Sequence, residues 1–396
     1  MKIRILILCL IFAGSLAFAQ TKIINFETTS FAEIKAKAKK ENKLIFMDAY
    51  TSWCGPCKFM AKMVFTNDTV ADYFNAHFIN AQFDMEKGEG IDIAKLYEVR
   101  CYPNLLFIDG DGKLVHRGAG SSDAKHFIQL AMDALNPEKR FSRYKDEYAT
   151  KKTDPAFLLE YIDAISKTCL KSDDILQDYF KTQKDEALTN RVNWNIIRNY
   201  SSNYKSREFT YLLANLETFN KAYTADSVNS KIVNVFLNSG YPFIYKKGMK
   251  EADYRAYVEE IKKINFVASD EVLFKLDMAY AEKNGDWKGY IALIVEKGDK
   301  YIHSADEFNN ISWTIYEHSD DKAAMQQAES WMQKAIKEMP NAAFYDTYAA
   351  VLFKLNKKKE AKAAATKSIK LAKAEGEPAD EYKSTTEMLQ KIEKLK

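Results

Sequence analysis

Residues 53–57 read Trp53-Cys54-Gly55-Pro56-Cys57, and the first part of the chain is organised around this stretch. Two thiols separated by Gly-Pro, with an indole ahead of them, suit a reversible disulfide. The preceding run, Leu44-Ile45-Phe46-Met47, has the apolar character of a buried strand. The following residues, 58–63, place apolar side chains on one side of a helix. The motif is therefore predicted to lie where a strand leads into a helix.

That position has a chemical consequence for Cys54. The first turn of a helix has free backbone N–H groups and the positive end of the helix dipole, and both stabilise a thiolate. Pro56 fits this turn because its missing N–H donor costs nothing there. The sequence therefore predicts redox chemistry at Cys54 and Cys57.

The composition predicts a large globular protein. A chain of 396 residues is long enough for two or more domains, and its 47% apolar and 29% charged residues exclude a disordered chain. The net charge of +3 is too small over this length to indicate nucleic-acid binding. Gly (14) and Pro (7) are scarce, which favours a largely helical protein.

The first residues have the pattern of a signal peptide. Lys2 and Arg4 provide a positive start, residues 5–12 are apolar, and Ala17-Phe18-Ala19 is a small-x-small cleavage pattern. We expect residues 1–19 to be removed and the chain to be exported, to the periplasm if the source is a Gram-negative bacterium. An uncleaved membrane anchor is the alternative.

Cleavage would remove Cys9 and leave four cysteines. Only Cys54 and Cys57 are close in sequence, so the thiols are predicted to serve chemistry and not scaffolding. A zinc site would need two further ligands, and we expect no metal and no cofactor. Cys101 is either a third thiol open to oxidation or inert packing, and Cys169 is interpreted as structural.

Strand and helix patterns alternate up to about residue 135. A capping box at Ser30-Phe31-Ala32-Glu33 opens a helix, and Asp109-Gly110-Asp111-Gly112 predicts a hairpin. The other predicted elements are strands at 44–50, 78–85, 104–108 and 113–117, helices near 70–76 and 91–97, and a last helix capped by Ser122 that ends near Leu135. This order predicts an α/β sandwich with the reactive motif at the carboxyl end of a strand.

Residues 21–136 resemble a thioredoxin of the exported kind. The resemblance rests on the 53–57 motif followed by Lys58, on Asp48 six residues before Cys54, and on Tyr102-Pro103 ahead of an apolar strand. The closing hairpin and helix complete it. The resemblance implies that Cys54 is the exposed nucleophile and Cys57 the buried resolving thiol.

The resemblance also implies roles for neighbouring residues. It implies that Pro103 is cis and that its loop, with Tyr102, receives an extended substrate beside the disulfide. Buried Asp48 would assist proton transfer at Cys57, although an ordinary polar residue at a strand end is the alternative. Gln82 stands where many thioredoxins have a lysine near this carboxylate. Trp53 suits either substrate contact or simple packing.

The remainder of the chain is predicted to be helical. Asp154-Pro155 is an N-cap followed by proline at the first helical position, and residues 137–265 form a helical domain in this interpretation. Residues 266–396 contain a 33-residue repeat that is typical of tetratricopeptide hairpins. In it, Ala328, Trp331, Met332 and Ala335 recur as Ala361, Ala364, Ala365 and Ser368. Such repeats form either a partner-binding groove or a structural extension.

The predicted function is that of an exported thiol:disulfide oxidoreductase with a Cys54/Cys57 dithiol. The thioredoxin-like domain would comprise residues 20–136 and would act on disulfides in substrate proteins. An unidentified electron donor, expected in the membrane, would re-reduce it, and the repeats would recruit a partner protein. The alternative is an interaction or holdase protein whose thioredoxin-like domain is only a redox-sensitive anchor.

Overall fold

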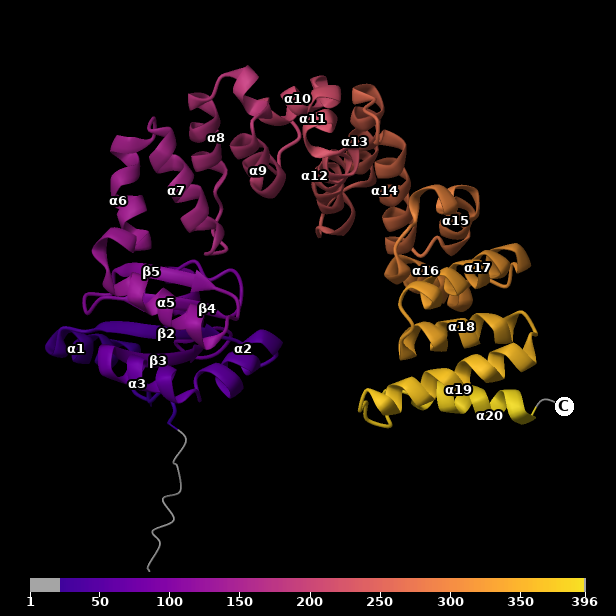
Figure 1. Ribbon diagram of the computed structural model, residues 1–396, viewed down its shortest axis with the longest axis horizontal. Coiled ribbons are helices and arrows are strands. Elements are labelled where there is room, and N and C mark those ends of the chain that lie inside the picture. Colours follow the sequence, from indigo (N-terminus) through magenta and orange to yellow (C-terminus); the bar gives the residue numbers. More distant parts are fainter. Residues whose placement is uncertain (1–21, 395–396) are drawn as a thin grey trace, which may run out of the picture. The chain divides into compact units, whose positions relative to one another are not determined.

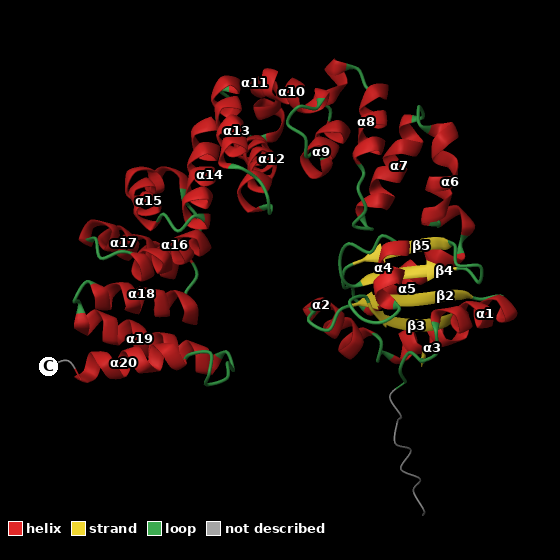
Figure 2. Ribbon diagram, turned by 180° about the vertical axis from the view of Figure 1, so that it is seen from behind, coloured by secondary structure: helices red, strands yellow, loops and turns green. Residues whose placement is uncertain are grey.

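The computed structural model describes residues 22–394, so the predicted signal peptide lies outside the described residues. The chain divides by packing into two compact units, one that ends at Ala187 and one that begins at Leu188. Figures 1 and 2 show that the strands of the described chain all belong to the first unit. The thioredoxin-like fold and the helical region were both predicted, and both are confirmed.

A five-stranded mixed sheet forms the centre of the first unit. Its order is β1-β3-β2-β4-β5; β1 and β2 each run parallel to β3, while β2–β4 and β4–β5 are antiparallel. The strands are β1 (Phe26–Glu27), β2 (Leu44–Tyr50), β3 (Phe78–Asp84), β4 (Asn104–Ile108) and β5 (Leu114–Ala119). Four of these strands match the predicted ones closely, and β1 was not predicted because two residues give no periodic signal.

Helices cover both faces of the sheet. They are α1 (Phe31–Glu41), α2 (Gly55–Phe59), the π-helical turn η1 (Met60–Val64), α3 (Asp68–His77), α4 (Gly90–Leu96) and α5 (Ala124–Leu135). The capping box at Ser30 is present as predicted. The prediction that Ser122 caps the last helix was wrong, because Asp123 accepts the His126 N–H at 2.8 Å. A carboxylate one residue nearer the helix takes the place of the hydroxyl.

Strand β2 separates two hydrophobic cores because its side chains alternate between the faces. Phe46 points into a core with Phe74 of α3 and Phe127 of α5, which Met60 and Val64 of η1 also join. The neighbouring Ile45 and Met47 belong to the opposite core, under α1 and α4. Asp48 shares the Phe46 face by this alternation, so it lies on the side covered by the helical segment that follows Cys57.

Three further helices belong to the first unit. They are α6 (Phe141–Lys151), α7 (Pro155–Ser166) and α8 (Asp173–Thr182), preceded by the 3-10 turn η2 (Pro137–Lys139) and followed by η3 (Asp185–Thr189). Asp154 caps α7 with Pro155 at its first turn, as predicted. The predicted sequence boundaries near residues 136 and 265 remain predictions, while packing groups α6–α8 with the sheet.

His116 of edge strand β5 anchors α6. Its Nδ1 accepts the backbone N–H of Phe141, the first residue of α6, at 3.0 Å. Only a neutral imidazole can accept this bond, and burial lowers the pKa of His116 to about 4. The contact between α6 and the sheet therefore depends on an uncharged histidine.

Acid should weaken this contact in a defined pH range. The pKa of His116 is lower in the folded state than in the unfolded state. Neutral His116 therefore contributes fully to the free energy of unfolding above about pH 6.5, and this contribution is lost as pH falls through 4. The loss should be about 3 kcal/mol. In a fragment ending at Ala187, Trp53 is the only tryptophan and can report urea unfolding. His116→Gln, which does not titrate, should lose less stability than wild type between these pH values; an equal loss would refute the role of His116.

The second unit is helical throughout its described residues. Its helices are α9 (Arg191–Tyr200), α10 (Arg207–Ala214), α11 (Leu216–Tyr223), α12 (Ala225–Tyr245), α13 (Glu251–Ile264), α14 (Ser269–Lys283), α15 (Trp287–Tyr301), α16 (Ala305–His318), α17 (Lys322–Glu338), α18 (Ala342–Lys354), α19 (Lys358–Ala374) and α20 (Lys383–Lys394). The eight residues of the predicted 33-residue repeat are all buried, in α17 and α19. No helix of residues 22–394 is long and apolar enough to cross a membrane.

Candidate active site

Cys54 and Cys57 form a disulfide at the junction of β2 and α2. Cys54 is the N-cap of α2, and its Sγ accepts the backbone N–H of Cys57 at 3.1 Å. Pro56 lies in the first turn, where no donor is needed. The predicted strand-to-helix junction is therefore confirmed. A thiolate released at Cys54 would keep a backbone donor and the helix dipole beside it.

The two sulfur-bearing residues are similarly covered in this oxidised form. Cys54 is 3% exposed and Cys57 is 4% exposed, so the expected contrast between an exposed and a buried thiol is not seen here. The exposed group of the motif is Trp53, with 64% of its surface accessible. Its indole Nε1 donates to Glu86 Oε2 at 3.0 Å, which fixes the ring over the region that follows β3.

The loop before β4 lies beside Trp53. The Tyr102 ring is 5.9 Å from the Trp53 ring in an edge-to-face arrangement, and the Tyr102-Pro103 peptide bond is cis, as predicted. Burial is the main cause that raises the pKa of Tyr102, and the carboxylates of Glu86 and Asp84 add to it. The structure thus brings together Trp53, Tyr102 and Pro103, which the resemblance implied for substrate contact.

Asp48 is a buried carboxylate of strand β2. It is 1% exposed, and its Oδ2 accepts a hydrogen bond from Gln82 Nε2 at 2.9 Å across the β2–β3 register. Asp48 Oδ1 has no hydrogen-bond partner. Burial raises the pKa of Asp48 to about 6, and the Gln82 donor opposes that shift. A carboxyl with this pKa can take or give a proton near neutral pH, as the role that the resemblance implies for Asp48 requires.

A thioredoxin-type sheet with a Cys-Gly-Pro-Cys disulfide at a helix N-terminus defines the class: a thiol:disulfide oxidoreductase. A family model described as "Thioredox_DsbH: Protein of unknown function, DUF255" matches residues 21–104. Thioredoxin-2 of Saccharomyces cerevisiae is 34% identical over 95 residues, which is 24% of this chain and 85% of the relative. Thioredoxin-1 of the same yeast is 31% identical over 113 residues, which is 28% of this chain and 99% of the relative. Through its N-terminal region the chain belongs to the thioredoxin family.

Two further similarities were found. The thiol:disulfide interchange protein DsbD of Yersinia pestis is 28% identical over 123 residues, which is 30% of this chain and 21% of that protein. A solution structure titled a putative disulphide-isomerase from Bacteroides thetaiotaomicron is 46% identical; the match covers 30% of this chain and 98% of that one, with a TM-score of 0.28.

One feature near the site was not predicted from the sequence. Cys101 and Cys169 form a second disulfide, so Cys101 is neither a free thiol nor inert packing, and the Cys54–Cys57 pair is not the only disulfide of the described residues. Cys169 was interpreted as structural. Its disulfide does link the α7–α8 turn to the segment before Pro103. The even number of cysteines left after the leader was the one signal that could have indicated this pair.

Proposed function

We propose that this chain is an exported thiol:disulfide oxidoreductase that reduces or exchanges disulfides in substrate proteins, while its helical unit recruits a partner. The observation that carries the proposal is the Cys54–Cys57 disulfide at the start of α2. Reduced Cys54 would attack a substrate disulfide and form a mixed disulfide. Cys57 would then resolve it, releasing the reduced substrate and restoring the Cys54–Cys57 bond.

The surface around the motif supports a protein substrate. Trp53, Phe59 and Met63 are 64%, 47% and 58% exposed, although all three are large apolar side chains. Phe59 and Met63 lie four residues apart on the helical segment that follows the disulfide, so they share one face. An exposed apolar surface of this kind favours contact with an unfolded or extended polypeptide.

Two observations support export. The sequence of residues 1–19 has the charge, apolar run and cleavage pattern of a signal peptide. The Cys101–Cys169 bond lies outside the reactive motif, and disulfides of that kind persist mainly in oxidising compartments. For a Gram-negative source the compartment would be the periplasm, and electrons would then have to come from a membrane donor.

The helical unit supports the recruiting part of the proposal. Its paired helices α16–α17 and α18–α19 bury the alanine-rich positions that recur in the sequence, as tetratricopeptide-type hairpins do. Stacked hairpins expose an extended surface on which a partner can bind. A bound partner would raise the effective concentration of its disulfide near Cys54.

A truncation after Ala187 tests recruitment. The fragment keeps the whole first unit, so its rate of insulin reduction should stay within about twofold of the full chain. Its rate on a physiological substrate, identified by trapping mixed disulfides with Cys57→Ser, should fall by about a hundredfold. Equal loss on both substrates would show that the helical unit supports the fold. No loss on either would remove recruitment and favour a separate interaction or holdase role.

A further inference from the structure

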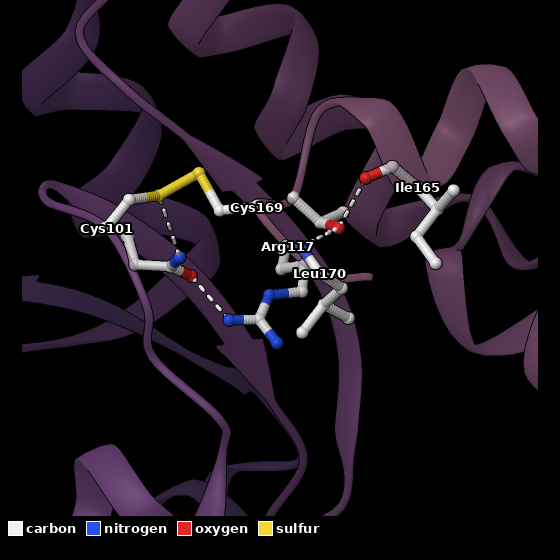
Figure 3. The surroundings of a disulfide bond; sticks show 7 residues. Cys101, Arg117, Ile165, Cys169 and Leu170 are labelled. Atoms are coloured by element: carbon white, nitrogen blue, oxygen red, sulfur yellow. Dashed lines mark hydrogen bonds between the residues drawn. A yellow bond between two sulfur atoms is a disulfide. The ribbon is translucent and has the colours of Figure 1, made fainter. Parts of the chain in front are cut away.

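The Cys101–Cys169 disulfide joins two segments that are 68 residues apart in sequence (Figure 3). Cys101 lies two residues before Pro103, and Cys169 lies in the turn between α7 and α8. Cys169 is exposed and Cys101 is half-buried, whereas Cys54 and Cys57 are almost completely covered. The second disulfide is therefore the more accessible of the two. Exposed disulfides are as a class more easily reduced than buried ones.

A buried arginine orients a donor toward the Cys101 sulfur. Arg117 is 3% exposed, and its Nη2 donates to Asn104 Oδ1 at 2.9 Å, while Nη1 donates to the Tyr97 carbonyl at 2.9 Å. Because the amide oxygen faces a group that can only donate, the amide nitrogen must face the other way. It lies 3.8 Å from Cys101 Sγ (Figure 3). Burial lowers the pKa of Arg117 to about 10, so its charge persists at neutral pH.

This arrangement favours Cys101 as a leaving group. A thiolate at Cys101 would gain the Asn104 N–H as a hydrogen-bond donor. The buried cation Arg117 lies on the other side of the same Asn104 amide group. A thiol whose thiolate is stabilised leaves a disulfide faster than an ordinary one. Attack on the disulfide is therefore expected at Cys169, with Cys101 departing.

The Cys169 side leaves room for that attack. The turn is fixed by Thr168, whose Oγ1 donates to the Ile165 carbonyl at 2.6 Å and accepts the Leu170 N–H at 3.2 Å. Beside it is a cleft of about 390 Å³, lined by residues adjacent to both cysteines, Arg100 on one side and Leu170 and Lys171 on the other. An approaching thiolate would reach exposed Cys169 beside this cleft.

We propose that Cys101–Cys169 is a second redox-active disulfide that accepts electrons from a thioredoxin-type dithiol, such as the reduced Cys54/Cys57 pair of another copy. The donor's Cys54 thiolate attacks Cys169 Sγ, the S–S bond breaks, and Cys101 leaves as a thiolate beside Asn104. The donor's Cys57, as thiolate, then attacks Cys54 and releases Cys169. Two electrons reach the Cys101/Cys169 pair, the donor becomes the Cys54–Cys57 disulfide, and the released thiolates take up protons from solvent and from the donor thiol.

Reduction has a structural consequence near the first site. It removes the covalent link between the α7–α8 turn and the segment that leads into Tyr102-Pro103. The redox state of the second pair would thus set how firmly the loop beside Trp53 is held.

The test uses two full-length variants, each with Cys9→Ser. The acceptor has Cys54→Ser and Cys57→Ser, and the donor has Cys101→Ser and Cys169→Ser. The reduced donor is mixed with an equal amount of oxidised acceptor. Alkylation and mass mapping then report the redox state of each cysteine pair over time. We expect Cys101 and Cys169 to become alkylated while the donor pair becomes oxidised. The proposal rests on donor activity, so insulin reduction by the same donor is the control. A donor that reduces insulin but never the acceptor would overturn it.

Asn104→Asp in the acceptor tests the leaving-group argument. The new carboxylate is the same size and still accepts from Arg117, but it cannot donate to Cys101. Reduction should slow by about tenfold or more, as expected when a hydrogen bond to a charged group is lost. Simple loosening of the structure would expose the disulfide and speed reduction. An unchanged or faster rate would therefore contradict the role of Asn104, and thermal unfolding would confirm that both acceptors are folded.

Discussion

Cys54→Ser is expected to abolish insulin reduction, with a loss of more than about a thousandfold, because removing a nucleophile removes the covalent step that the other residues assist. Serine is close to cysteine in size and can still accept the Cys57 N–H, so α2 should remain capped. Thermal unfolding should therefore change little. The rates of insulin reduction by wild type and by Cys54→Ser, both measured with excess reductant, give the comparison directly.

Cys57→Ser is the matched variant that separates the two thiols. Turnover should be lost here too, but Cys54 should still attack and remain joined to the insulin chain. Mass spectrometry of the mixture should find that mixed disulfide in Cys57→Ser and not in Cys54→Ser. The opposite distribution would mean that Cys57 is the nucleophile and that the assigned roles are reversed.

Asp48→Asn is expected to raise stability at neutral pH while lowering activity. The folded-state pKa of Asp48, about 6, lies above its unfolded value of 3.8. Protonated Asp48 therefore contributes fully to the free energy of unfolding below pH 3.8. This contribution is lost as pH rises through 6. Between about pH 3 and pH 8 the variant should gain about 3 kcal/mol relative to wild type, since asparagine never becomes charged.

Urea unfolding of the fragment ending at Ala187, measured at both pH values with oxidised disulfides, checks this gain. Asp84→Asn on the same sheet is the control of opposite sign, because hydrogen bonds from Lys87 and the Glu86 N–H lower the pKa of Asp84. That variant should lose stability relative to wild type over the same range. If Asp48→Asn also lost stability relative to wild type between these pH values, Asp48 would not be a destabilised buried carboxylate.

The activity of Asp48→Asn separates a proton-transfer role from a merely structural one. Loss of a positioned acid or base costs about a hundredfold or more when that step limits the rate. A variant that is more stable and slower at pH 7 would support proton transfer by Asp48. A variant that is more stable and equally fast would leave Asp48 without a catalytic role.

Local patterns were sufficient to predict the redox motif and its surroundings. The apolar run before Cys54 and the helix after it are contiguous in sequence, so one stretch determined both the strand-to-helix junction and the N-cap. The resemblance to thioredoxins implied that Gln82 lies near Asp48, and the β2–β3 register places the two residues opposite each other. The chemistry of the motif itself is readable from one sequence because it rests on neighbouring residues.

Contacts between distant segments could not be predicted in the same way. Cys101 and Cys169 are separated by 68 residues and were assigned to different domains, so their spacing carried no signal. His116 similarly gave no sign that it would accept the Phe141 N–H, because the docking of α6 on β5 depends on the packed fold. The Asn104–Arg117 pair, which orients a donor toward Cys101, has the same origin.

The Cys54/Cys57 dithiol is expected to pass two electrons to protein disulfides. The most direct measurement is a single turnover, in which the fully reduced wild-type chain is mixed with excess oxidised insulin and quenched with an alkylating agent. Mass mapping then shows which cysteines have become oxidised as insulin is reduced. We expect one Cys54–Cys57 disulfide to form for the first insulin disulfide reduced, while Cys101 and Cys169 remain reduced and are therefore alkylated. Insulin reduction with Cys54 and Cys57 still alkylated, or no reduction at all, would contradict it.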